Sequence, residues 1–149
     1  MKILHPTDFS ECADLAQEQA IRLARAMGGE IILLHVALDT PLYGEGLMAM
    51  REVKAVYEAQ RKWATEALEA RAAAIRPQGP PTRWRLERGV PHEEIVSVAT
   101  ADGADLIVMG TRGLSGLERF FLGSVADRVI RTAPCPVLTV RGPKGEGDR

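Results

Sequence analysis

Short apolar runs alternate along this chain with longer segments of helical period, and this alternation restricts the possible folds more than any other feature. A strand, a helix and a second strand in succession form a βαβ unit, which places the two strands parallel in one sheet. The five strands predicted from the runs are Lys2 to His5, Glu30 to Ala37, Thr82 to Arg88, Asp105 to Met109 and Pro136 to Arg141. The predicted fold class is therefore α/β, with an open parallel sheet and helices on both faces.

The segments between these strands have helical spacing of apolar residues. The predicted helices are Ser10 to Met27, Leu47 to Arg76, Pro91 to Ala101 and Ser124 to Thr132. In the first helix the predicted buried stripe is Ala16, Ala20, Leu23 and Met27. The long second helix repeats apolar residues from Met50 to Ile75, and the pair Ser124 and Asp127 resembles a capping box at the start of the last helix.

Length and composition place this chain among single globular domains. It has 149 residues, of which 46% are hydrophobic, enough for one full core. We expect one domain over residues 1–141. The tail 142–149 has no apolar side chain to bury and is expected to be disordered, and Leu38 to Gly46 is expected to be an irregular loop.

Charge and cysteine content exclude several classes of partner. The chain carries 19 Lys plus Arg against 20 Asp plus Glu, so it lacks the basic excess of a general nucleic-acid binder or of a membrane-surface protein. No apolar run approaches the ~20 residues of a membrane span. Cys12 and Cys135 form neither a disulfide framework nor a zinc pattern, which predicts a reducing compartment. The segment before Pro6 offers too little for a signal peptide, so we expect a cytoplasmic location.

In open parallel sheets, ligands bind beyond the carboxyl ends of the strands. After the fourth predicted strand, Gly110 and Gly113 are followed by nine residues and then by Gly123 and Ser124 at a helix start. Glycine permits close backbone approach and positive φ, a helix N-terminus favours anions, and Arg112 could add a positive charge. These features predict a phosphate-binding loop; the alternative is that the glycines only form turns between strand and helix.

Other polar residues have two possible roles. Asp8 follows the first strand, where its carboxylate could accept from a ligand or cap the helix that begins near Ser10. His5 and His35 end or nearly end neighbouring strands, but two histidines without a third ligand are expected to be packed core or rim groups, so no metal site is predicted. No arrangement of catalytic residues follows from the spacing.

Four segments together resemble the universal stress protein family, over nearly the whole chain from Lys2 to Arg141. They are Lys2-Ile-Leu-His-Pro-Thr-Asp8, Ile31-Ile-Leu-Leu-His-Val36, Gly89-Val-Pro-His-Glu-Glu-Ile95 and the pattern from Gly110 to Ser124. The most specific is G-x-x-G, nine residues, G-S, which in that family marks the members that bind ATP, and this chain fills every position of it.

The resemblance implies a Rossmann-like sheet of order 3-2-1-4-5 and an ATP site made by matching residues. In the family, Pro6, Thr7 and Asp8 would contact ribose and adenine, Val36 would contact adenine through its backbone, and Met109 and Gly110 would lie near the ribose. Gly113, Gly123, Ser124 and Val125 would contact the phosphates, and we add Arg112 to this set. The implied cofactor is ATP with Mg²⁺.

The expected function is that of an ATP-binding stress protein regulated by its nucleotide, with little hydrolysis. The alternative is a slow ATPase or another adenine-nucleotide enzyme on the same fold. An adenylating enzyme would need a glycine-rich loop after the first strand, where this chain has Pro6 to Ser10 without glycine, and a Walker P-loop is also missing from the sequence. A phosphoacceptor receiver would need Asp and Lys where Arg88 and Arg141 stand.

The last strand, Pro136 to Arg141, would lie at a sheet edge in this strand order. Val137, Leu138, Thr139 and Val140 offer no charge to prevent pairing with another chain. Members of the family commonly dimerise through this strand, so we expect a homodimer. The alternative is that Pro136 and Arg141 keep the edge single.

Overall fold

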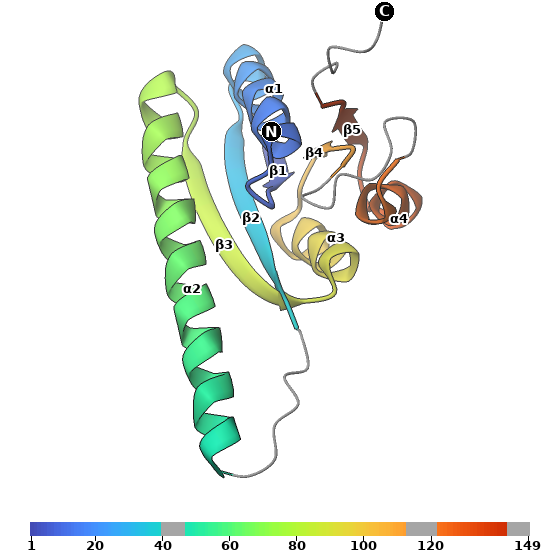
Figure 1. Ribbon diagram of the computed structural model, residues 1–149. Coiled ribbons are helices and arrows are strands. Elements are labelled where there is room, and N and C mark those ends of the chain that lie inside the picture. The colour runs from blue at the N-terminus through green and yellow to red at the C-terminus, as the bar shows by residue number, and fades with distance from the viewer. Residues whose placement is uncertain (40–46, 113–121, 143–149) are drawn as a thin grey trace, which may run out of the picture.

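The computed structural model describes residues 1–39, 47–112 and 122–142, and within them the predicted fold class is confirmed. One parallel sheet has the strand order β3-β2-β1-β4-β5 (Figure 1). Its strands are β1 (Lys2–Pro6), β2 (Glu30–Leu38), β3 (Thr82–Gly89), β4 (Leu106–Gly110) and β5 (Val137–Val140). The helices are α1 (Glu11–Met27), α2 (Leu47–Ile75), α3 (Pro91–Asp102) and α4 (Ser124–Thr132), with a short 3-10 helix η1 (Arg76–Gln78) after α2.

Each of these strands and α-helices lies within one residue of its predicted bounds at either end. Leu38 belongs to β2 rather than to the predicted loop, because β2 stays paired with β3 as far as Gly89. The remainder of that loop from residue 40, and the predicted tail from residue 143, lie outside the described residues.

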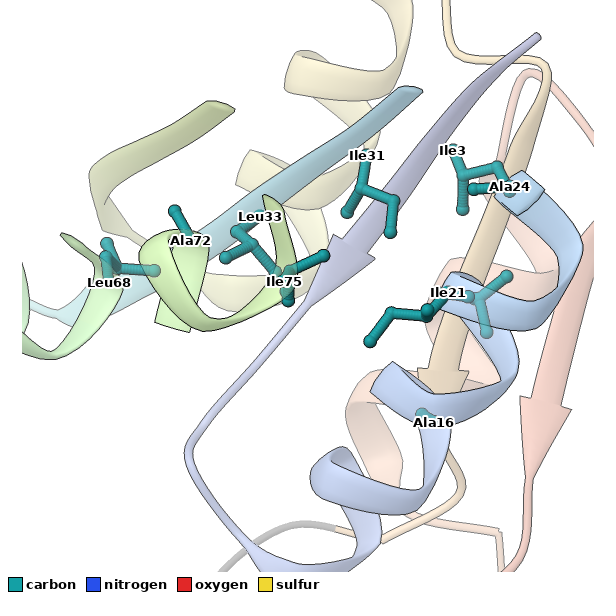
Figure 2. Close-up of a cluster of buried hydrophobic side chains, with 11 residues drawn as sticks. Ile3, Ala16, Ile21, Ala24, Ile31, Leu33, Leu68, Ala72 and Ile75 are labelled. Atoms are coloured by element: carbon teal, nitrogen blue, oxygen red, sulfur yellow. The ribbon is translucent and has the colours of Figure 1, made fainter. Parts of the chain in front are cut away.

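Helices cover the sheet in two layers because successive side chains of a strand point to opposite faces. One face packs against α1 and α2 in a cluster that includes Ile31 and Leu33 (Figure 2). The other face packs against α3 and α4 in a cluster that includes Leu4, Ile32 and Leu34. Since the central strands are covered on both faces, Ile31 to Leu34 form one continuous buried run.

The buried face of α1 differs from the predicted stripe. Ala16 and Ala20 are buried as predicted, and Leu23 is half-buried against the same cluster. The fully buried stripe continues through Ile21 and Ala24, and Met27 lies outside it. Met27 is 58% exposed because it is the last helical residue, where Gly28 in the left-handed conformation turns the chain toward β2.

From Met50 onward, where its side chains are described, α2 packs closely on the sheet only over its second half. Its buried residues are Ala64, Leu68, Ala72 and Ile75, whereas Met50, predicted to share that face, is 68% exposed. Figure 1 shows the first turns of α2 running past the end of the sheet, so helical spacing there does not bring burial.

His5 lies within the core of the sheet and replaces a missing backbone donor. Continuation of the β1–β4 ladder beyond Leu4 and Ile107 would pair the Val108 carbonyl with the N–H of residue 6, but Pro6 has none. Instead, His5 Nδ1 lies 2.8 Å from the Val108 oxygen and donates to it. His5 Nε2 has no partner among the described residues, and burial lowers the pKa of His5 from 6.5 to about 4.

This histidine should make the stability of the fold sensitive to acid. Because its folded pKa lies below the unfolded value, the unfolded chain binds a proton first as the pH falls from 6.5 to about 4. The unfolding free energy of wild type should therefore fall across this window by ~3 kcal/mol more than that of His5→Gln. Urea titrations at the two ends of the window measure the difference; equal losses in both proteins would contradict this role.

Candidate functional site

The carboxyl ends of β1 and β4 form the point where the winding of the sheet reverses. From β1 the chain enters α1 on one face, and α4 lies on the opposite face beside β4. In open parallel sheets the space beyond the strand ends at such a divergence is where ligands bind, and we call this space the crevice. The predicted site residues at this edge are Pro6 at the end of β1, Thr7 and Asp8 after it, Val36 in β2, Met109 and Gly110 at the end of β4, Arg112 beyond it, and Gly123, Ser124 and Val125 at the start of α4. Gly113 lies outside the described residues.

The turn from β1 to α1 is held by its own side chains. Thr7 Oγ1 accepts the N–H of Phe9 at 3.1 Å, and Asp8 Oδ1 accepts the N–H of Ser10 at 3.0 Å. Ser10 is the N-cap of α1, accepting the N–H of Ala13. Asp8 therefore stabilises the turn that precedes α1, and Ser10 rather than Asp8 caps the helix.

Val36 directs its backbone toward this crevice. The Glu30 N–H donates to Met1 and the Leu34 carbonyl accepts from Thr7, so alternate residues of β2 face β1. Val36 is the next residue in that series, but the registered pairing of β1 with β2 ends at Leu34. The N–H and C=O of Val36 thus face the space beyond the end of β1.

Gly110 faces the same space from the other side, whereas Met109 does not. The N–H groups of Ile107 and Thr111 bond to β5, so the intervening even-numbered residues of β4 face β1. Met109 therefore directs its backbone toward β5, and its side chain is buried in the core beneath α3 and α4. Met109 supports the crevice from below rather than lining it.

Two glycines allow close packing at this edge, and neither uses positive φ as the sequence argument expected. A Cβ on Gly110 would lie 2.8 Å from the sulfur of Cys12 and 3.1 Å from its backbone. Gly123 has φ −60°, and a Cβ there would lie 2.9 Å from the Thr111 carbonyl oxygen, which accepts the Gly123 N–H at 2.7 Å. Thr111 thereby ties β4 to the start of α4, a backbone role that no sequence pattern reveals.

No side chain of the described residues caps the N-terminus of α4. Gly123 is its N-cap and Ser124 its first residue, so the predicted capping pair is wrong. The carboxylate of Asp127 accepts instead from Arg131 one turn later, at 3.1 and 3.2 Å. Among the described residues, the first N–H groups of α4 are therefore not used by a capping side chain, and the helix dipole there favours an anion.

Arg112 follows β4, and its guanidinium extends toward the end of β5 rather than toward β1. A Cβ on Gly142, just after β5, would lie 2.6 Å from Arg112 Nη2. The side chain is half-buried there. The positive charge of Arg112 thus lies beside the chain leaving β5.

Metal and membrane features are lacking in the part of the chain that the structure describes. There, no group of three His, Cys, Asp or Glu side chains could hold a metal ion, and no helix is long and apolar enough to cross a bilayer. Cys12 and Cys135 are both free thiols.

Comparison with known protein sequences identifies the family of this chain. The model of the universal stress protein family matches residues 1–141. Universal stress protein MJ0531 of Methanocaldococcus jannaschii is 40% identical over 145 residues, covering 97% of this chain and 84% of that protein.

Solved structures give the same result. That of protein MJ0577 superposes with a TM-score of 0.87 at 31% identity, over 97% of each chain. The universal stress protein of Archaeoglobus fulgidus, solved in complex with dAMP, has a TM-score of 0.65 at 26% identity, over 94% of this chain and 97% of that one. On the family match and these relatives, the chain belongs to the universal stress protein family.

Proposed function

We propose that this protein binds ATP with Mg²⁺ in the crevice between β1 and β4, and that the bound nucleotide regulates a role in the stress response. The observation that carries the proposal is that, within the described residues, the N-terminus of α4 lacks a side-chain cap and lies at the same sheet edge as the Val36 backbone, beyond the end of the β1–β2 pairing. The groups that we propose for the phosphates and for the base are thereby brought to one crevice. A relative solved with dAMP supports an adenine nucleotide as the ligand.

The described groups suit the parts of ATP. The N–H and C=O of Val36 would meet the adenine ring, which offers a ring-nitrogen acceptor beside an amino donor. Pro6, Thr7, Asp8 and Gly110 would surround the ribose, with Met109 behind them. The phosphates would lie at the N-terminus of α4, against Gly123, Ser124 and Val125, with Gly113 and Arg112 as further proposed contacts. Mg²⁺ would come with the phosphates and complete the charge balance.

ATP should raise the melting temperature of the dialysed protein in the presence of Mg²⁺. A ligand at about 100 times its dissociation constant stabilises a fold by ~2.7 kcal/mol. Gly123→Val should abolish this shift, because its side chain would collide with Thr111 where the phosphates are expected. Differential scanning calorimetry with and without ATP measures both proteins.

Gly28→Ala is the matched control for a general loss of stability. Gly28 has φ +63° and caps α1 at its C-terminal end, far in the fold from α4. This variant should melt earlier than wild type yet keep the full ATP shift. A wild-type protein whose melting temperature ignores saturating ATP would refute the proposal, and an undiminished shift in Gly123→Val would move the site elsewhere.

Hydrolysis of the bound ATP should be slower than ~1 per second, the lower end of ordinary enzyme turnover. The carboxylate of Asp8 accepts from Ser10 and that of Asp127 from Arg131, so both have structural partners. His5 is buried, with its Nδ1 donating to Val108. Release of phosphate from purified protein measures the rate; faster turnover would favour the alternative of an ATP-using enzyme.

We also propose a homodimer that forms through β5. Pro136 and Val140 accept hydrogen bonds from β4, so the residues of opposite parity, Val137 and Thr139, direct their N–H and C=O groups to the open edge. The four residues of β5 carry no charge. The other edge strand, β3, carries Arg83, Arg85, Glu87 and Arg88, which disfavour pairing with another chain.

Thr139→Pro should separate the dimer. Proline removes an outward N–H without removing a bond to β4, and Thr139→Val keeps that N–H as the matched control. Sedimentation equilibrium at micromolar concentration should show twice the chain mass of 16.2 kDa for wild type and Thr139→Val, and a monomer for Thr139→Pro. A wild-type monomer would rule out the dimer, and a dimeric proline variant would place the interface elsewhere.

A further inference from the structure

The carbonyl of Thr7 has an unexpected partner. The Thr7 N–H donates to Leu34 at 2.8 Å, and the next step of a parallel ladder would join the Val36 N–H to the Thr7 carbonyl. Instead, His35 Nδ1 lies 2.8 Å from that oxygen. Because a carbonyl only accepts, His35 must carry its proton on Nδ1 and donate.

This bond changes what is available to a ligand. Across the described residues, no hydrogen bond joins the Val36 N–H to Thr7. Val36 nevertheless faces the β1 side of β2, so its N–H points into the space where the strand pairing has ended. The side chain of His35 thus donates to the carbonyl that would take the Val36 N–H in a continued ladder.

Aromatic packing holds the His35 ring in place. Phe9 stacks at a tilt on it, with ring centroids 4.8 Å apart, and Trp63 of α2 meets Phe9 edge-on at 5.1 Å. Phe9 itself has φ +63°, a conformation that costs a bulky residue energy and persists only where the surroundings enforce it. Arg71, paired with Asp14 at 2.6 Å, lies over the Phe9 ring and supplies part of that enforcement.

We propose that His35 is a positioning residue, which donates to the Thr7 carbonyl in place of Val36 and so leaves the Val36 N–H for the base of the nucleotide. The inference rests on the proposed function for its ligand. Its structural half states that His35 controls the bonding of the Val36 N–H, with or without nucleotide. Its functional half states that this N–H then binds the base. His35 itself touches no part of the ligand and acts through Thr7.

Amide hydrogen exchange in nucleotide-free protein tests the structural half. In His35→Leu the Thr7 carbonyl loses its donor, so the Val36 N–H should turn to it and exchange about tenfold more slowly than in wild type. In His35→Asn the side-chain amide can replace Nδ1–H, and Val36 should exchange as in wild type. A residue that merely supports the core would have the opposite effect, since its loss would speed exchange at Val36 and at neighbours such as Ile32.

Calorimetric titration with ATP and Mg²⁺ tests the functional half on the same three proteins. His35→Leu should weaken binding about tenfold, the effect of one modest hydrogen bond, and His35→Asn should recover most of it. Unchanged or faster Val36 exchange in His35→Leu, or undiminished ATP affinity, would overturn the inference. A wild-type protein that binds no ATP would overturn the proposed function instead, and the exchange of Val36 would still decide whether His35 controls that amide.

Discussion

The early end of the hydrogen-bond ladder on β1 is the constraint on which the candidate site depends. β1 is the central strand, paired with β2 on one side and β4 on the other, so its last residues decide what both neighbours expose. Pro6 has no N–H to give β4, and after Thr7 the chain turns away into α1. The backbones of Val36 and Gly110 therefore face the same crevice from opposite sides.

Two histidines compensate for this early end, and both do so by donating from Nδ1. His5 donates to the Val108 carbonyl, for which Pro6 has no N–H. His35 donates to the Thr7 carbonyl, to which the Val36 N–H does not bond. A buried carbonyl without a partner would cost free energy comparable to a lost hydrogen bond. The two side chains therefore let the sheet stop abruptly without orphaned carbonyls at those positions, which favours an open edge for a ligand.

Sequence patterns were sufficient to predict the elements because apolar runs and helical spacing report burial directly. They failed at helix ends: Met27 keeps helical spacing but is the last residue of α1, and Met50 lies in the first turns of α2, which run past the end of the sheet. The pair Ser124 and Asp127 has the spacing of a capping box, yet Gly123 takes the cap because its N–H bonds to Thr111. Motif spacing could place the site at the sheet edge, but it could not reveal that Met109 faces the core or that His35 holds Thr7, since both depend on strand register.

The central claim, a nucleotide held between the backbone of Val36 and the N-terminus of α4, is tested most directly by a crystal structure of the protein grown with ATP and Mg²⁺. The account predicts adenine within hydrogen-bond distance of Val36, the phosphates at the first N–H groups of α4, and His35 Nδ1 still on the Thr7 carbonyl. A nucleotide bound elsewhere, or a crevice that stays empty at saturating ATP, would contradict it.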